Sequence, residues 1–379
     1  MDRFAAEIER LKAAHGYRTL RPASGIDFTS NDYLGLAAHP ALREATKKAL
    51  DEYGIVGAGG SRLLRGHHPL HAELETRAAD FFSCPKTLYF GSGYLANLAL
   101  FSTLCGRRDA VVFDENIHAS MKEGIHASPA ERYRAKHNDI SSFEKNLKKA
   151  RSAGSQSIWI ALESLYSMDG DFAPLRELAM LAHKYDARLI IDEAHATGVF
   201  GKTGRGLSQD LTTDLNAVNT IAVHTCGKAL GVAGAIVCGS APTIDFLINK
   251  ARPFIYSTAP PPMLAASLIR ALELIDEEPE RRETLLARVN FAKEQLQAAA
   301  SGALHFSGSQ IIPVILGDEE LTVKIAADMQ ATGFDTRAIR PPTVPQGTSR
   351  LRISINAMHT EDDIAALGAA LGRALERSK

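Results

Sequence analysis

The middle of this 379-residue chain alternates short apolar runs with amphipathic helical patterns. The clearest example begins with SIWIALES at residues 157–164, continues through LRELAMLAHKYD at 175–186, and ends with RLIIDEAH at 188–195. A strand, a crossover helix and a second strand of these lengths form a βαβ unit, in which the two strands run parallel. Further apolar runs stand at TLYF, AVVF, TIAVHT and AIVCG. The sequence therefore predicts an α/β fold, with a mostly parallel sheet between layers of helices.

Two acidic residues end the strands of this βαβ unit. Glu163 closes the first strand and Asp192 closes the second. Ligands of open α/β sheets bind beyond the carboxyl ends of the strands. We therefore expect both carboxylates at the rim of a site.

Composition changes along the chain suggest three parts. Residues 1–35 are expected to form an N-terminal arm, and residues 36–270 a large domain that carries the sheet. Beyond residue 270 long helices dominate and strands become fewer, so residues 271–379 are expected to form a smaller α+β domain. A helix is predicted over Pro40–Tyr53, closed by Gly54, and a capping box of Thr360 with Asp363 predicts the start of the last helix.

Charge and cysteine content exclude several classes of protein. Lys and Arg number 43 against 44 Asp and Glu, which argues against an electrostatic binder of nucleic acid. No apolar run approaches the roughly 18–20 residues that a membrane-spanning helix needs, and the N-terminal segment alternates charged with apolar residues, unlike a secretory signal. The four cysteines form no CxxC pair. A cytoplasmic protein without a disulfide framework is expected.

Three motifs invite other interpretations. GSGYLA at 91–96 matches the GxGxxA dinucleotide fingerprint and is followed by Asp114, so a dinucleotide dehydrogenase stays open as an alternative. DEAH at 192–195 and ATGVFGKT at 196–203 imitate nucleotide-hydrolase motifs, but both follow one strand, where a true site needs two. His67, His68 and His71 lack a Cys or carboxylate at zinc spacing, and we interpret them as a solvated helix face.

HTCGKALGVAG at 224–234 is a different kind of motif. A strand delivers Lys228 into a turn flanked by Gly227 and Gly231, whose small size lets a planar ligand approach the backbone. Burial would lower the pKa of the amine and favour imine chemistry. Together with the acid Asp192 and a glycine-led helix for a phosphate, this lysine meets the three requirements of a pyridoxal 5′-phosphate (PLP) site.

Nine segments, in order over about residues 15–365, resemble the α-oxoamine synthases, which are fold-type I PLP enzymes. They are FTSNDYLGL (28–36), GAGGSRLLRG (57–66), SGYLAN (92–97), IHAS (117–120), ESLYSMDGD (163–171), DEAHATGVFGKTGRG (192–206), CGKALG (226–231), YSTAPPP (256–262) and IRPPTVPQGTSRLRIS (339–354).

The resemblance implies roles for matching residues. Lys228 would bind the cofactor covalently and move the Cα proton, Asp192 would pair with the pyridine nitrogen, and His118 would stack on the ring. The other implied cofactor ligands are His195 and Ser167 at the ring oxygen, Gly93, Tyr94 and Thr225 at the phosphate, and Ser257 and Thr258 at the phosphate of the partner subunit in a homodimer. The implied substrate ligands are Arg352, with Arg350 as its competitor on the same strand, and Arg18, Arg340 and Thr343, with Arg21 competing with Arg18.

The resemblance also implies a reaction. Within the family, the short chain and the IRPPTVP segment favour the member of the biotin pathway, which condenses L-alanine with a pimeloyl thioester of coenzyme A or acyl carrier protein and releases carbon dioxide. Members of the glycine C-acetyltransferase or 5-aminolevulinate synthase type remain alternatives, as does a same-fold aminotransferase or lyase. Acyl-chain length, thioester carrier and the choice between alanine and glycine stay open.

Overall fold

A computed structural model describes residues 2–13, 16–20, 22–209, 211, 220–300 and 302–378. The chain divides into two compact units, one of residues 34–166 and 172–282 and the other of residues 1–33, 167–171 and 283–379. The predicted boundaries of arm, large domain and C-terminal domain stay predictions. Among the described residues, no helix combines the length and the apolarity needed to cross a membrane.

The unit of residues 34–166 and 172–282 is built on a sheet of seven strands in the order β2-β8-β7-β6-β5-β3-β4. Its strands are β2 (Lys86–Phe90), β3 (Ala110–Asp114), β4 (Glu131–Ala135), β5 (Ile158–Glu163), β6 (Ala187–Asp192), β7 (Thr220–Thr225) and β8 (Ala235–Gly239). Its helices are α2 (Pro40–Tyr53), α3 (Pro69–Phe81), α4 (Gly93–Leu104), α5 (Ala119–Ala127), α6 (Ile140–Ser152), α7 (Leu175–Lys184), α9 (Ala241–Lys250), α10 (Arg252–Ile255) and α11 (Pro262–Glu277).

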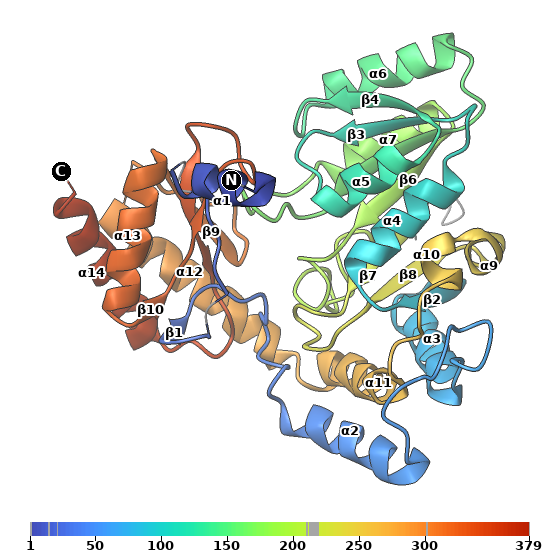
Figure 1. Ribbon diagram of the computed structural model, residues 1–379, viewed down its shortest axis with the longest axis horizontal. Coiled ribbons are helices and arrows are strands. Elements are labelled where there is room, and N and C mark those ends of the chain that lie inside the picture. The colour runs from blue at the N-terminus through green and yellow to red at the C-terminus, as the bar shows by residue number, and fades with distance from the viewer. Residues whose placement is uncertain are drawn as a thin grey trace. The chain divides into compact units, whose positions relative to one another are not determined.

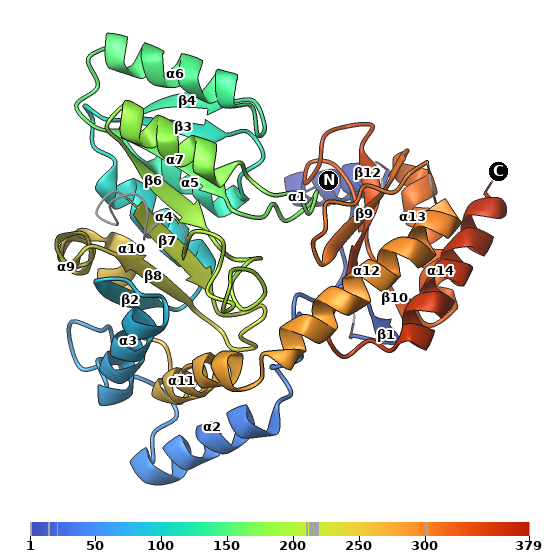
Figure 2. The ribbon, with the colours of Figure 1, turned by 180° about the vertical axis from the view of Figure 1, so that it is seen from behind.

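Strand direction confirms the predicted α/β architecture. β3, β4, β5, β6 and β7 pair in parallel, whereas β8 is antiparallel to both β7 and β2, which makes the sheet mixed. Helices α4 and α5 cover one face (Figure 1), and α6 and α7 cover the other (Figure 2). The central strands β5 and β6 are almost entirely buried, as parallel strands covered on both faces must be.

Local sequence signals explain individual elements of this unit. Helix α2 starts with Pro40 in its first turn and ends before Gly54, whose φ of 64° is the left-handed conformation that glycine adopts without strain. Register places Glu163 opposite Asp192 at the carboxyl ends of β5 and β6, as predicted. This register brings both carboxyl-terminal residues to the edge of the sheet where the site is expected.

The other unit combines helices with two small sheets. Its elements are α1 (Arg3–Ala13), β1 (Ile26–Asp27), α12 (Glu280–Ala300), β9 (Ile311–Gly317), α13 (Glu319–Ala331), β10 (Phe334–Asp335), β11 (Ala338–Ile339), β12 (Ser349–Ser354) and α14 (Glu361–Glu376). β1 pairs in parallel with β10, and β11-β12-β9 form an antiparallel sheet. Helices α13 and α14 lie side by side in both views (Figures 1 and 2). The predicted capping box of Thr360 and Asp363 starts α14.

The prediction of a solvated histidine face holds for His67, which is exposed, but is wrong for His71. His71 is fully buried and its Nε2 lies 2.9 Å from the carbonyl oxygen of Pro260. His68 caps the start of α3, and His67 Nδ1 accepts a hydrogen bond from Arg62 at 3.0 Å. The three side chains therefore join structural contacts, and no group of residues that could hold a metal is found in the described part of the chain.

Candidate active site

The candidate site lies at one edge of the seven-stranded sheet. β2 and β7 are both antiparallel to β8, and β7 is parallel to β6, so β2, β6 and β7 end at the same edge. Helix α4 begins just after β2, Asp192 ends β6, and Thr225 ends β7. Side chains far apart in the sequence are thereby brought together.

Lys228 lies in the connection between β7 and β8. Its Nζ is 2.8 Å from Nε2 of His195, and the lysine is half-buried while the histidine is buried. Gly231 has a φ of 68°, and a Cβ atom there would collide with the backbone of Leu36 and Ala37. The glycine is therefore required for this turn to pack, and the turn holds the lysine at the edge of the sheet.

Asp192 is a buried carboxylate, 4% exposed, held by two donors. Its Oδ1 accepts from the backbone N–H of Ala194 at 2.9 Å, and its Oδ2 accepts from Nδ2 of Asn97 at 2.7 Å. Hydrogen bonds of this kind hold a carboxylate in one orientation and stabilise its charge. Asp192 is thus positioned to pair with a cationic group.

Asn97 is not among the residues that the sequence predicts for the site. It projects from α4, one turn after Gly93, and is 1% exposed. Its Nδ2 also donates to Oγ of Ser120 at 3.1 Å, whereas its Oδ1 has no partner among the described residues. The last residue of the SGYLAN segment is its only sequence signal, since the contact to Asp192 spans 95 residues.

His118 caps the start of α5. Its Nδ1 accepts from the backbone N–H of Ser120 at 3.2 Å and lies 2.8 Å from Oγ of the same serine. Partial burial lowers the pKa of the imidazole, the charge of Asp192 opposes that change, and the charge of Lys228 adds to it. His118 therefore stands in the electrostatic field of both residues, with its ring plane fixed by the helix cap.

The start of α4 forms a cradle for an anion. Ser92 is the N-cap, and its Oγ accepts from the N–H of Leu95 at 3.2 Å. The first amides of a helix, here those of Gly93 and Tyr94, have no intrahelical acceptor and attract phosphate. A Cβ atom on Gly93 would stand 2.5 Å from Oγ1 of Thr225, so only glycine leaves this space open. The Tyr94 side chain is exposed and its hydroxyl donates to Glu123.

Ser257 and Thr258 follow α10 and line a small pocket with Arg62 and Phe254. Thr258 forms an isolated antiparallel bridge with Ser61, in the glycine-rich segment 57–66. That segment is fixed by an ion pair between Arg62 and Glu75, with 3.0 Å between Nη2 and Oε2. Thr258 itself is exposed.

Arg352 belongs to the unit that contains residues 283–379. Its guanidinium donates to the Ser167 carbonyl at 2.6 Å, to Ser354 Oγ at 2.8 Å and to Asn31 Oδ1 at 3.0 Å. All of its hydrogen-bond partners in the described residues are neutral. A buried guanidinium held only by neutral acceptors suits an incoming carboxylate.

Arg350, the competitor of Arg352, already has an acidic partner. It lies on the same face of β12, but it pairs with the Asp169 carboxylate and donates to the Met168 carbonyl at 3.3 Å. Its charge is therefore already compensated within its own unit.

Arg18, Arg340 and Thr343 are also brought together within that unit. Nη2 of Arg18 is 3.4 Å from Oγ1 of Thr343, and Arg18 and Arg340 line a cavity of about 570 Å³ with Tyr17 and residues of α13. Arg21, the competitor of Arg18, lies outside the described residues.

The dinucleotide and nucleotide-hydrolase motifs have structural explanations. Asp114 is fully buried, and its carboxylate oxygens bind Nδ1 of His137 at 2.9 Å and the N–H of Asn138 at 2.8 Å, so it is not available to a ribose. Glu193 of the DEAH segment is fully buried and accepts from Ser164 Oγ at 2.6 Å and the N–H of Leu207 at 3.1 Å. Burial raises the pKa of this carboxyl. Both carboxylates therefore accept structural hydrogen bonds that hold neighbouring loops.

The residues at the sheet edge fit PLP. An amine on Lys228, a buried carboxylate on Asp192 and the open cradle between Gly93 and Thr225 supply the three types of contact that an aldehyde, a pyridine nitrogen and a phosphate require. All of these residues belong to the same unit.

Comparisons with known proteins agree with this site. The family model for aminotransferase class I and II matches residues 23–371. An 8-amino-7-oxononanoate synthase from Aromatoleum aromaticum is 41% identical, and the alignment covers 98% of each chain.

Solved structures match over most of the chain as well. A serine palmitoyltransferase from S. paucimobilis with a bound PLP–myriocin aldimine has a TM-score of 0.90 at 29% identity, covering 99% of this chain and 97% of that one. The 8-amino-7-oxononanoate synthase of Francisella tularensis has a TM-score of 0.79 at 30% identity, with coverage of 94% and 99%. These matches confirm the predicted fold type and cofactor, and this chain belongs to the PLP-dependent aminotransferase class I and II family and, within it, to the 8-amino-7-oxononanoate synthases.

Proposed function

We propose that this chain condenses L-alanine with a pimeloyl thioester and releases carbon dioxide and the carrier thiol, giving 8-amino-7-oxononanoate for biotin synthesis. The observation that carries the proposal is the contact of Lys228 Nζ with His195 Nε2 beside the buried carboxylate of Asp192. The relatives at 40–43% identity that bear this enzyme name support the choice of reaction.

Five residues would bind the ring and phosphate of the cofactor. Lys228 would hold it through Nζ, and Asp192, oriented by its two donors, would keep the pyridine nitrogen protonated. The bound cofactor supplies an electron-withdrawing ring that stabilises negative charge on the α-carbon of the amino acid. The amides of Gly93 and Tyr94, with Oγ1 of Thr225, would hold the phosphate.

The remaining cofactor contacts are proposed from the family resemblance. His118 would lie against the ring, its plane set by the cap of α5. His195 would approach the ring oxygen while its Nε2 orients Lys228, and Ser167 would approach the same oxygen.

Lys228 would transfer the protons of the reaction. Its Nζ would take the Cα proton of alanine and return a proton after carbon dioxide leaves. His195 Nε2, 2.8 Å away, would fix the direction of that amine. Precise placement of a general base accounts for a large share of such a rate enhancement.

Arginines would bind the substrate. The guanidinium of Arg352 would hold the alanine carboxylate, because its present acceptors are neutral and yield to a charged one. Arg18, Arg340 and Thr343 would contact the acyl substrate.

The enzyme is further proposed to act as a homodimer in the cytoplasm. Thr258 is exposed and Ser257 half-buried, consistent with contacts to the phosphate in a partner subunit. The four cysteines are all free thiols, consistent with a reducing compartment.

One assay tests the reaction. Purified protein with PLP is offered alanine, glycine or serine together with acyl thioesters of several lengths, on coenzyme A and on acyl carrier protein, and free thiol is measured. Thiol release that is greatest with alanine and a pimeloyl thioester supports the proposal. Release with glycine and a short acyl group would overturn it in favour of another condensation, and an α-keto acid product without thiol release would indicate amino-group transfer.

A second assay tests the shared site. Lys228→Ala and the double variant Ser257→Ala/Thr258→Ala are each expected to be inactive. Mixed subunits should regain activity, since one of the two sites in a hybrid dimer would be intact. Absence of any recovery after demonstrated subunit exchange would contradict the partner contact.

A further inference from the structure

Two of the four thiols form a pair away from the catalytic lysine. Cys84 stands just before β2, after a turn in which Ser83 has a φ of 52°. Cys238 lies on the neighbouring strand β8, where it pairs with Thr87. The Cys84 thiol donates to the Lys86 carbonyl oxygen at 3.6 Å, and both cysteines line one pocket. The turn at Ser83 and the pairing of β2 with β8 thus bring the two cysteines to the same pocket.

The paired thiols have unequal chemistry. The nearby Cys238 thiol lowers the pKa of Cys84, and the partial burial of Cys84 opposes this effect. Burial raises the pKa of Cys238, which is 4% exposed. Because Cys84 is half-buried while Cys238 is buried, a reagent from solvent reaches Cys84 first, and its lowered pKa favours the reactive thiolate.

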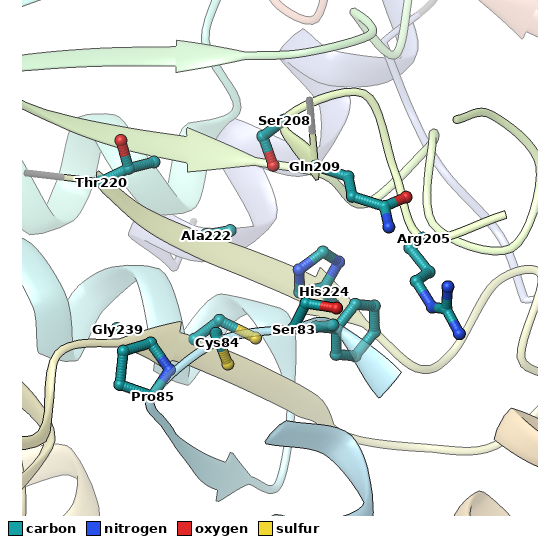
Figure 3. A pocket seen from close by; sticks show the side chains of 12 residues that line it. Ser83, Cys84, Pro85, Arg205, Ser208, Gln209, Thr220, Ala222, His224 and Gly239 are labelled. Atoms are coloured by element: carbon teal, nitrogen blue, oxygen red, sulfur yellow. The ribbon is translucent and has the colours of Figure 1, made fainter. Parts of the chain in front are cut away.

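A small pocket gives access to this pair. Cys84 is half-buried, and both cysteines line a pocket of about 30 Å³ with Pro85, His224 and Gly239. Figure 3 shows Cys84 between Pro85 and His224 on the wall of this pocket. A volume of that size holds only one or two molecules as small as water. Hydrogen peroxide is only slightly larger than water, so it can reach the Cys84 thiol.

We propose that Cys84 and Cys238 form a peroxide-oxidisable dithiol. The Cys84 sulfur attacks one oxygen of hydrogen peroxide, the O–O bond breaks, and the other oxygen leaves as water after taking a proton. The resulting Cys84 sulfenic acid is attacked by the Cys238 sulfur, an S–S bond forms, and its oxygen leaves as a second water. The two thiols lose two electrons and two protons, and one peroxide becomes two waters.

Cys105 and Cys226 provide matched controls within the same chain. Both are at most 1% exposed, and burial raises the pKa of each. Neither is expected to react while the chain is folded. The four cysteines lie in four different tryptic peptides, Cys84 in residues 78–86 and Cys238 in residues 229–250, so each can be followed separately.

Peptide mapping without reduction tests the proposal. The PLP-loaded protein is treated with a few equivalents of hydrogen peroxide, and the peptides 78–86 and 229–250 are expected to become linked, with a mass loss of 2 Da. Cys238→Ser should stop at the sulfenic acid of Cys84, which dimedone traps, and Cys84→Ser should slow oxidation of Cys238 at least tenfold. Cys105→Ser should oxidise like the unchanged protein.

Several outcomes would overturn the proposal. They are a linkage between any other two peptides, a Cys84 that keeps its free thiol, and a Cys238→Ser variant without a dimedone adduct on residues 78–86. None of these readouts uses the condensation reaction, so they are independent of the proposed function.

Discussion

The side-chain amide of Asn97 donates a hydrogen bond to the buried carboxylate of Asp192, with 2.7 Å between Nδ2 and Oδ2. The same nitrogen donates to Ser120 Oγ, which in turn lies 2.8 Å from Nδ1 of His118. These hydrogen bonds connect Asp192, the acid proposed for the pyridine nitrogen, to His118, the imidazole proposed for the ring face. Asn97 is therefore a positioning residue with consequences for both.

Asn97→Ala should lower kcat/KM about ten- to hundredfold. The loss of a hydrogen bond to a charged group costs about 1.5–3 kcal/mol, and about 1.4 kcal/mol corresponds to a factor of ten. Steady-state kinetics and titration with PLP measure the effect. Asn146→Ala is the control. Asn146 lies on α6, and its Nδ2 donates to the Arg134 carbonyl oxygen at 2.9 Å, so its substitution should change kcat/KM less than threefold. An Asn97→Ala enzyme within twofold of normal would contradict the assigned role.

Asp192→Asn should lower kcat by at least about a thousandfold, since it keeps the shape of the side chain and removes the charge opposite the ring nitrogen; that factor corresponds to about 4 kcal/mol. The measurement is the turnover number at saturating PLP. Asp114→Asn changes a buried carboxylate at the end of β3, on the same sheet edge, and should stay within about fivefold. Equal losses in both variants would show that the charge at Asp192 has no special part.

Substitutions of the two arginines on β12 should have different effects on the KM for alanine. Arg352→Lys replaces a planar fork by a single ammonium group, so KM for alanine should rise at least about tenfold while kcat falls less. Arg350→Lys keeps a charge beside Asp169 and should leave KM for alanine nearly unchanged. The reverse order of the two KM values would reassign the carboxylate site to Arg350.

Acid stability should depend on His71. Burial, with the nearby charge of Arg62, lowers the pKa of this imidazole from 6.5 to about 4 in the folded chain. Between these values the unfolded chain binds the extra proton, so the free energy of unfolding should fall as pH drops from about 6.5 to about 4 and be fully present above 6.5. The difference corresponds to a loss on the order of 3 kcal/mol.

Urea unfolding at a series of pH values checks this. His71→Gln lacks the titrating group and should flatten the decline between pH 6.5 and 4, whereas His126→Gln, on the surface end of α5, should leave it unchanged. A decline of the same depth in His71→Gln would show that other groups cause the acid sensitivity.

Local patterns were sufficient for much of the fold. Apolar runs bounded by turn residues predict β5 and β6, and a first-turn proline with a terminal glycine predicts α2, because these signals act through neighbouring residues. Strand β4 was not predicted. Its sequence, ERYRA, carries three charged residues, which an edge strand exposes to solvent.

The same distinction between local patterns and distant contacts applies to individual residues. Lys228 and Asp192 follow strands whose pattern is visible, so their meeting at one sheet edge is predictable from topology. Asn97 and His71 act through contacts to Asp192 and Pro260, which are 95 and 189 residues away. Such contacts depend on helix packing, which the spacing of residues does not encode, and the solvated face predicted for His71 was wrong for that reason.

The most direct test concerns the attachment of PLP to the chain. The holoenzyme is reduced with borohydride, digested and mapped, and the pyridoxyl group is expected on Lys228, whose Nζ lies beside His195. Lys228→Ala should show no borohydride-stable label and no visible absorbance after removal of free PLP. A label on a different lysine, or a Lys228→Ala protein that still retains a reducible colour, would contradict the assignment of the site.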